Sequence, residues 1–491
     1  MIDTISVLAQ KPSIDKKQIL ANIVRILHYD GQQLPQHIRL RWEQLKEMLS
    51  GSDFSSRMKR YIGMDLLEDS YDEGGNRVDQ VQPRIEELAQ QVIENPQLLS
   101  KELPWLVTAE AQNGYRFGYE LGKRDTAFSL LPILLDAQRQ ADRNANAFFL
   151  SGYFRVLFDD DRHQWEEQSD LLAEDKTLRV WLPELTWRSG LTERAGLRLL
   201  TLAEENAINV GQLRFFGAGR MIQDLAEGIF RRWIRFLLSS PHPNALPVAL
   251  DLYYIYYVDR ESSHKLPQQE TLTILTHPSW IEPVEGVRLD LMDYHHWAEV
   301  GKAFAQAYPE ESKLLATWML EHSGKRGTIL DPFSETVSVL SQITERSPQE
   351  IWPMITKYLG PPIDVRAFHL RNWLRGEDES IGVQVRGMLS HIPLELVWAW
   401  VDGDIEQRAR YFAGFVPKSL FRGEDCLARE VLIRYGERND VRQAFSANYF
   451  TGAWSGPESI HYESVKRKLL DFKSEEENQN VKRWIDEYVD G

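Results

Sequence analysis

The chain has 491 residues, 43% of them apolar and 26% charged, which excludes wholesale disorder and allows about two to four domains or one elongated repeat array. The formal net charge is −16, which disfavours a general electrostatic grip on nucleic acid or on an anionic membrane. The single cysteine, Cys426, excludes a disulfide framework and a cysteine-rich zinc site. The sequence has no long apolar run and no signal-peptide pattern, so we expect a cytoplasmic protein without a membrane span.

Apolar residues recur at three- and four-residue steps along most of the chain, which predicts helices. The first runs are 19–29 and 84–99, and the second is expected to end before Pro96. Runs of the same kind follow at 195–205, 221–238, 297–308, 312–323 and 459–472. The best strand-like stretch, 271–281, could equally form a short helix. Many helices separated by short Pro and Gly breaks predict an all-α protein.

A weak internal repeat occurs near the C-terminus. The motif begins at Asp364, Asp404, Asp440 and Asn480, at spacings of 40, 36 and 40 residues. Each start is followed by Val or Ile and a charged residue, which is typical of an N-cap and the first helical turn. A period near 40 with two helices predicts a HEAT-like α-solenoid of stacked helix pairs, although a chance alignment of so short a motif is the alternative.

Composition changes suggest where the chain divides. Residues 65–76 hold five acids and a Gly-Gly pair, which predicts an exposed loop, and the proline-rich stretch 239–247 predicts a seam near the middle. We expect four parts: an N-terminal helical segment (1–76), a first helical repeat region (77–265), a middle repeat region (266–360) and HEAT-like C-terminal repeats (361–491).

The common motifs of catalysis are missing from the sequence. Three Gly-Lys pairs lack the following Ser or Thr of a phosphate loop, and Gly-x-Ser-x-Gly does not occur. The glycines of 114–123 are instead expected to let two helices approach closely. Cys426 lies in an apolar helical pattern, which favours a core position over a nucleophile. We therefore expect a protein that is not an enzyme and has no cofactor.

Two groups of residues could bind a metal. Asp160, His163 and Glu167 have the i, i+3, i+7 spacing that shares one face of a helix, although an acidic helix start explains them more simply. His295 and His296 follow two aspartates, but adjacent histidines face different directions, so at most one joins a given site. A metal site is thus the less favoured interpretation of both groups.

Two stretches are candidates for a binding surface. Residues 212–236 carry net charge +3 and interleave aromatic residues with Arg214, Arg220, Arg231, Arg232 and Arg235. An amphipathic helix with a charged outer stripe is the favoured alternative. Residues 251–258 contain Tyr253, Tyr254, Tyr256 and Tyr257, which suit either a protein interface or packing between helices.

Four stretches of the chain resemble the C-terminal helical region of large bacterial STAND-type NTPases of anti-phage defence: 42–69, 148–158, 185–208 and 454–489. In that family the helical region senses a foreign protein, an NTPase module oligomerises and an effector acts. This chain lacks the NTPase loop, so the resemblance implies only the sensing or scaffold part. Its implied partner is a phage protein or an NTPase or effector module, and no catalytic residue carries over.

Three hypotheses for function follow. The first is a non-enzymatic scaffold or sensor in antiviral defence that recognises a protein along a concave face, its acidic character favouring a basic partner. The second is a helical-repeat protein that binds nucleic acid through 212–236, which net charge disfavours. The third is a metal-dependent enzyme built on Asp160, His163 and Glu167.

Overall fold

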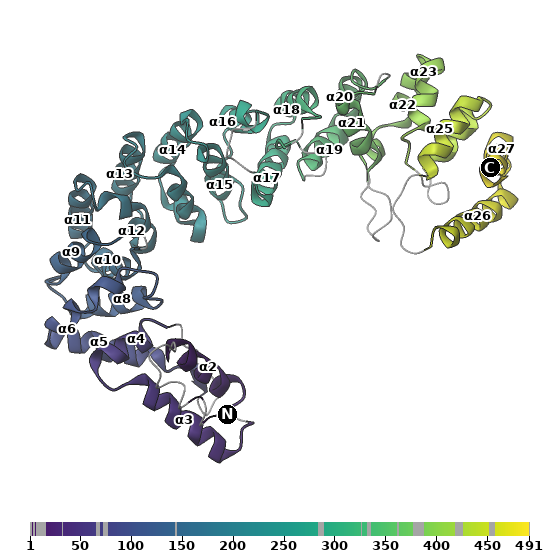
Figure 1. Ribbon diagram of the computed structural model, residues 1–491. Coiled ribbons are helices and arrows are strands. Elements are labelled where there is room, and N and C mark those ends of the chain that lie inside the picture. Colours follow the sequence, from purple (N-terminus) through teal and green to yellow (C-terminus); the bar gives the residue numbers. More distant parts are fainter. Residues whose placement is uncertain are drawn as a thin grey trace. The chain divides into compact units, whose positions relative to one another are not determined.

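The computed structural model is helical, apart from one short β-hairpin, over the part of the chain that it describes (Figure 1). That part comprises residues 2, 5, 16–31, 33–64, 69–71, 77–142, 145–282, 289–325, 327–330, 335–360, 363–376, 387–417, 426–450 and 457–490. The expectation of an all-α protein is therefore confirmed for the described residues. The chain forms two compact units, Met1–Val248 and Ala249–Gly491. Their boundary adjoins the predicted seam at 239–247, while the expected division into four parts stays a prediction.

Over the described residues from Lys16 onward, the first unit has three helices, then the hairpin, then a succession of helices. Its elements are α2 (Lys16–Tyr29), α3 (Gln36–Ser50), α4 (Phe54–Tyr61), β1 (Asp69–Tyr71), β2 (Arg77–Asp79), α5 (Val81–Glu94), α6 (Gln97–Ser100), α7 (Leu103–Leu106), α8 (Gly114–Arg124), α9 (Leu131–Arg139), α10 (Phe148–Asp160), α11 (Arg162–Glu174), η1 (Arg179–Trp181), α12 (Leu182–Ser189), α13 (Glu193–Glu204), η2 (Val210–Asp224) and α14 (Glu227–Ser239). The boundary between the units falls within α15 (Ala245–Tyr257).

The second unit is a further succession of helices. They are α16 (Gln268–Leu275), η3 (Pro278–Trp280), α17 (Leu291–Ala307), α18 (Pro309–His322), α19 (Val337–Arg346), α20 (Pro348–Thr356), α21 (Val365–Arg375), η4 (Met388–His391), α22 (Leu394–Asp402), α23 (Ile405–Ala413), α24 (Leu427–Tyr435), α25 (Asn439–Phe450), α26 (Glu458–Glu475) and α27 (Gln479–Asp490). The stretch 271–281 forms α16 and η3, so its helical interpretation is confirmed. In both units each helix packs mainly on helices that are near it in sequence.

The tightest packing in the first unit joins α8 and α10, where glycines remove the side chains between two backbones. A Cβ at Gly118 would lie 2.0 Å from the carbonyl oxygen of Phe149, and one at Gly152 would lie 2.0 Å from that of Tyr115. The sequence-based expectation that glycines in 114–123 allow close helix approach is confirmed. Large side chains such as Phe117 and Phe149 then stack beside this contact, with ring centroids 5.6 Å apart.

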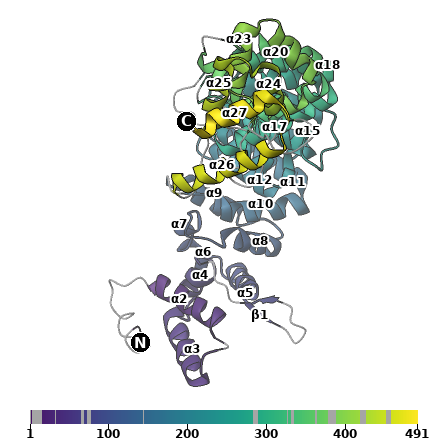
Figure 2. The ribbon, with the colours of Figure 1, turned by 90° about the vertical axis from the view of Figure 1, so that its right-hand side faces the viewer.

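The β-hairpin lies in the region predicted as an exposed loop. Strand β1 pairs antiparallel with β2, with Ser70 opposite Val78, and part of the predicted loop is therefore a strand (Figure 2). Residues 65–68 and 72–76 lie outside the described residues. Asp79 ends β2 and its carboxylate accepts a hydrogen bond from the backbone N–H of Val81 at 2.8 Å, which positions the start of α5. Helix α5 ends at Glu94, before Pro96, as the sequence predicts.

Two of the four residues that start the C-terminal repeat motif are helix N-caps in the structure, and two are not. Asp364 and Asp404 are N-caps, since their carboxylates accept from the backbone N–H groups of Ala367 at 2.7 Å and Gln407 at 3.3 Å. The N-cap interpretation is wrong for Asp440 and Asn480, which lie inside the first turns of α25 and α27. At α27 the side-chain oxygen of Asn478 accepts the first amides instead. The helices that contain the motif still begin 40, 34 and 40 residues apart, with another helix between each two.

Candidate binding surface

The arginines of α14 lie on the outside of the first unit. Arg231, Arg232 and Arg235 are exposed, whereas the apolar residues between them are buried. Arg235 Nε donates a hydrogen bond to the backbone carbonyl oxygen of Arg231 at 3.2 Å, which holds the Arg235 guanidinium against the helix. Trp233 points inward, where its Nε1–H donates to the carbonyl oxygen of Gly196 at 2.9 Å. Helix α14 is therefore an amphipathic helix with a charged outer stripe, which is the alternative favoured by the sequence.

The other two predicted arginines belong to η2. The expected helix over 221–238 is wrong at its N-terminal end, because η2 ends at Asp224 and α14 begins at Glu227. Within η2 the backbone leaves helical geometry at Ala218, and Gly219 and Arg220 have φ of 67° and 60°. Arg214 is exposed and Arg220 is half-buried. The break lies within η2, so residues 212–236 do not form one continuous helix.

The aromatic residues beside these arginines do not form a stacking platform. Phe216 is buried edge-on against Trp233, with ring centroids 5.5 Å apart. Phe215 is half-buried beside Trp187 at 5.2 Å. Rings that pack inside the unit cannot stack on a base without rearrangement, so the exposed arginines offer charge and hydrogen bonds alone.

The predicted tyrosines of α15 lie mostly in the interior of the second unit. Tyr253, Tyr256 and Tyr257 are buried, and Tyr254 is half-buried. Tyr253 shares a 2.8 Å hydrogen bond with the hydroxyl of Thr271, and Tyr256 stacks on His264 with ring centroids 4.0 Å apart. Packing between helices therefore accounts for these rings. The three buried tyrosines offer no accessible contact surface. A binding role for the four tyrosines stays a prediction.

The two histidines of α17 have different partners, as the sequence predicts. The Nδ1 of His296 is 2.7 Å from Asp251 Oδ1, and this pair is nearly buried, with Tyr254 stacked on the imidazole at 4.3 Å. The Nδ1 of His295 is 2.9 Å from Glu335 Oε2 near the surface. The preceding aspartates, Asp290 and Asp293, form the capping box of α17. The arrangement joins α15, α17 and the start of α19 and does not gather four metal ligands.

The geometry predicted for a metal site does not occur. Asp160 is the last residue of α10, whereas His163 and Glu167 belong to α11, so the three do not share one helix face. The helix breaks at Asp161, whose carboxylate accepts the backbone N–H of Gln164 at 2.9 Å and caps α11. His163 and Glu167 form an exposed pair at 3.6 Å. Within the described residues no group of three His, Cys, Asp or Glu is placed to hold a metal ion.

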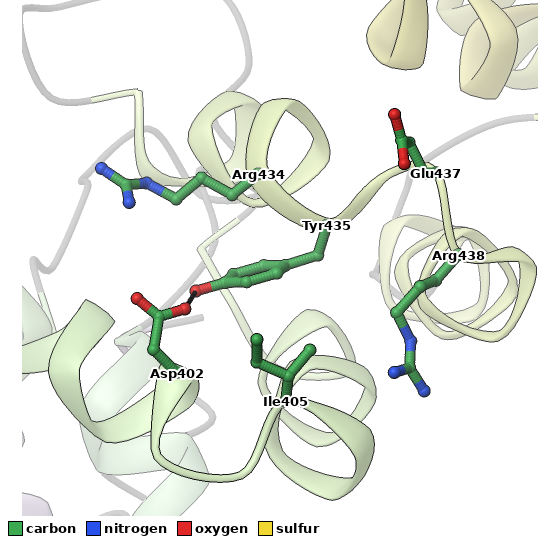
Figure 3. A pocket seen from close by; sticks show the side chains of 6 residues that line it. All are labelled: Asp402, Ile405, Arg434, Tyr435, Glu437 and Arg438. Carbon is green, nitrogen blue, oxygen red and sulfur yellow. Dashed lines mark hydrogen bonds between the residues drawn. The ribbon is translucent and has the colours of Figure 1, made fainter.

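A shallow pocket of about 350 Å³ opens where α22, α23 and α24 meet (Figure 3). The Tyr435 hydroxyl donates to Asp402 Oδ1 at 2.7 Å, and burial, then this hydrogen bond, raises the pKa of Tyr435. Arg438 forms ion pairs with Glu406 at 2.6 Å and with Asp440 at 3.0 Å. Asp402, Tyr435 and Arg438 thus have partners within the second unit, and these contacts stabilise the packing of neighbouring helices.

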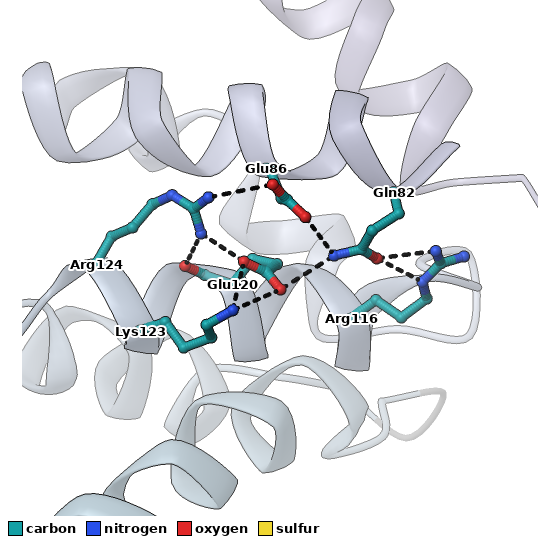
Figure 4. A network of polar contacts seen from close by, with 6 residues as sticks. All are labelled: Gln82, Glu86, Arg116, Glu120, Lys123 and Arg124. Atoms are coloured by element: carbon teal, nitrogen blue, oxygen red, sulfur yellow. Dashed lines mark hydrogen bonds and ion pairs between the residues drawn. The ribbon is translucent and has the colours of Figure 1, made fainter. Parts of the chain in front are cut away.

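A second polar network joins α5 to α8 (Figure 4). The buried carboxylate of Glu120 accepts hydrogen bonds from Gln82 Nε2 at 3.0 Å and Arg124 Nη1 at 2.5 Å, and Lys123 Nζ lies 3.4 Å away. Gln82 in turn accepts from Arg116 at 2.8 Å. The buried charge is compensated from within the chain, so the network has a structural role.

Comparison with protein-family models, with curated proteins and with solved structures finds no match to this chain. The resemblance to the sensing region of STAND-type NTPases therefore stays a prediction. Among the described helices, none combines the length and the apolar character needed to cross a membrane.

One group of side chains was missed by the sequence analysis. Arg371 and Arg375 lie one turn apart in α21, a helix that contains no acidic residue. The available signal was this i, i+4 pair of arginines without a neighbouring acid on the helix.

Proposed function

We propose that the chain is a helical-repeat scaffold or sensor, a HEAT-like α-solenoid, that recognises another protein through an extended surface. Two observations support this proposal. Helices in each unit pack mainly on their sequence neighbours, and near the C-terminus alternate helices begin 40, 34 and 40 residues apart. Such arrays expose long surfaces that suit large ligands rather than small metabolites.

The single observation that carries the choice of a protein ligand is the arrangement of α14. Its three arginines are exposed while the neighbouring Trp233 and Phe230 are buried. Guanidinium groups bind carboxylates bidentately, and arginine is enriched at protein interfaces. A nucleic-acid surface would gain from exposed rings for base stacking, and the rings here are inside. We therefore assign this arginine surface, with Arg214 of η2, to an acidic patch on a protein.

The test is an affinity capture that compares two charge-reversed variants. The tagged chain is used to capture ligands from bacterial lysate, with and without phage infection, with and without nuclease, and proteins are identified by mass spectrometry. The first variant carries Arg231→Glu and Arg232→Glu, and the second carries Arg467→Glu and Lys468→Glu. The second pair is exposed on α26 and changes the net charge equally.

A stoichiometric protein that survives nuclease, disappears with the α14 variant and remains with the α26 variant supports the proposal. Recovery of nucleic acid, or loss of all captured proteins on nuclease treatment, overturns it in favour of nucleic-acid binding. A phage protein or an NTPase or effector module among the captured proteins would extend the proposal to antiviral defence.

A further inference from the structure

One side of α21 combines two half-buried arginines with two exposed apolar side chains. Val365, Phe368, Arg371 and Arg375 recur at helical spacing and so lie along one side of the helix. Val365 and Phe368 are 55% and 53% exposed. Ala367, Leu370 and Leu374 on the opposite side are buried and attach α21 to the second unit.

Arg371 is held in place by the neighbouring helix α23 and the turn after it. Its Nη2 donates to the carbonyl oxygen of Gly414 at 2.5 Å, and its guanidinium lies over the rings of Tyr411 at 5.4 Å and Phe415 at 5.3 Å. Burial, together with the charge of Arg375, lowers the pKa of Arg371. The guanidinium is therefore partly dehydrated and preorganised.

Neither arginine has a carboxylate partner among the described residues. The Nε atoms of Arg371 and Arg375 are both inaccessible to water and make no hydrogen bond within that part of the chain. A guanidinium nitrogen without a hydrogen bond also occurs at Arg198 and Arg366, so the distinguishing feature is the carboxylate partner. The buried Arg198 contacts Glu166 and Asp170, and the buried Arg442 contacts Glu487. Since no anion lies beside them within the described residues, these two adjacent and partly dehydrated cations are unfavourable there, and a bound anion would relieve them.

We propose that this face of α21 binds a short acidic segment of a partner protein, whose carboxylates contact Arg371 and Arg375 and whose apolar side chain covers Val365 and Phe368. Charge complementarity selects the acidic residues, because the pair is positive in a chain of net charge −16. The exposed apolar residues select a peptide over a free anion. This site belongs to the second unit and is independent of the arginine surface of α14.

The test uses a fluorescein-labelled peptide of glutamates around a central leucine, with binding measured by fluorescence anisotropy on the full chain. We expect the wild type to bind it at least about tenfold more tightly than a peptide with glutamine at each glutamate. Arg371→Gln with Arg375→Gln should abolish this preference. Arg467→Gln with Lys468→Gln, on exposed residues of α26, is the matched control and should retain it.

A single variant separates binding from folding. Arg375 makes no hydrogen bond or ion pair within the described residues, so Arg375→Gln should leave the melting temperature unchanged or raise it while binding weakens about tenfold. Phe368→Ser should weaken binding of the leucine peptide but not of a peptide with glycine at that place. Unchanged binding in either variant overturns the proposal, as does inorganic phosphate that competes as well as the peptide.

An internal counter-ion is the remaining alternative. Glu377, Asp378 and Glu379 follow α21 in the sequence and lie outside the described residues. Neutralising all three, as Glu377→Gln, Asp378→Asn and Glu379→Gln, should maintain or strengthen peptide binding. If it lowers the melting temperature in the wild type but not in the Arg371→Gln, Arg375→Gln background, the arginines have an intramolecular partner and the proposal is overturned.

Discussion

Replacing Gly152 by alanine should destabilise the first unit through the contact between α8 and α10. The new Cβ would lie 2.0 Å from the carbonyl oxygen of Tyr115 and 2.7 Å from the backbone N of Tyr119. An ordinary contact is about 1.4 Å longer than the first of these, and backbone atoms cannot rotate away, so the helices must separate. Overpacking of this kind costs about 3 kcal/mol, and the better helix propensity of alanine returns about 1 kcal/mol. The net loss should be about 2 kcal/mol.

The assay is thermal and urea unfolding by circular dichroism, with hydrogen exchange to locate the change. For a unit of this size, about 2 kcal/mol corresponds to a fall in Tm of roughly 4–8 °C. Faster exchange should be confined to α8 and α10. Gly228→Ala is the control, because a Cβ at Gly228 of α14 meets nothing within 4 Å. A Gly152→Ala protein as stable as wild type, or one no less stable than the Gly228→Ala protein, would refute the argument.

Two further predictions concern buried charge and metal. Arg198→Met should lower the free energy of unfolding by about 3 kcal/mol, because it leaves the buried carboxylate of Glu166 without its cation. Urea denaturation measures this loss. An unchanged free energy of unfolding would mean that the Glu166 carboxylate is hydrated. Added Zn²⁺ or Mn²⁺ should shift the melting temperature of wild type and of His163→Ala equally in differential scanning fluorimetry, because Asp160 lies on a different helix from His163. A metal-dependent stabilisation found only in wild type would restore the metal interpretation.

Most of the helices could be predicted from sequence because their apolar residues recur at three- and four-residue steps. The same spacing could not locate the break between α10 and α11. Residues 159–161 are three consecutive aspartates, and each could cap a helix as well as continue one. The structure selects Asp161, and with that choice Asp160 leaves the face of His163 and Glu167. The motif at Asn480 failed for a related reason, since Asn478 supplies the cap of α27.

The exposure of the candidate binding residues could be predicted from the sequence for one helix and not for the others. The arginines of α14 are exposed as predicted for an amphipathic helix, because their neighbours Trp233 and Ile234 fix the buried side. Helix α15 is apolar on nearly all sides, so the sequence could not say which tyrosines are accessible. Arg371 and Arg375 were missed because the presence or absence of a counter-ion is a property of tertiary neighbours. The i, i+4 spacing of the two arginines is visible in the sequence, but it does not show whether a counter-ion lies beside them.

The ion pair of Glu476 with Arg429 gives a prediction for pH. The Glu476 carboxylate is 1% exposed and accepts from Arg429 Nε at 2.7 Å and Nη2 at 2.8 Å, and also from the amides of Glu477 and Asn478. The hydrogen bond from Arg429 outweighs burial and lowers the pKa of Glu476. Glu476→Gln should cost about 2 kcal/mol at pH 7, less than for a fully buried pair because Arg429 is 33% exposed.

The sign of the pH dependence follows from linkage. A carboxylate with a lowered pKa stabilises the fold fully above its unfolded-state pKa, about 4.3, and loses that contribution as pH falls through its folded-state pKa. The difference between wild type and Glu476→Gln in urea denaturation should therefore be constant from pH 7 to about 5 and shrink at lower pH. Glu430→Gln is the control, since Glu430 is half-buried 3.9 Å from the same arginine and should cost below about 0.5 kcal/mol. A difference that grows on acidification would mean that Glu476 is protonated in the fold, with its pKa raised by burial rather than lowered by Arg429.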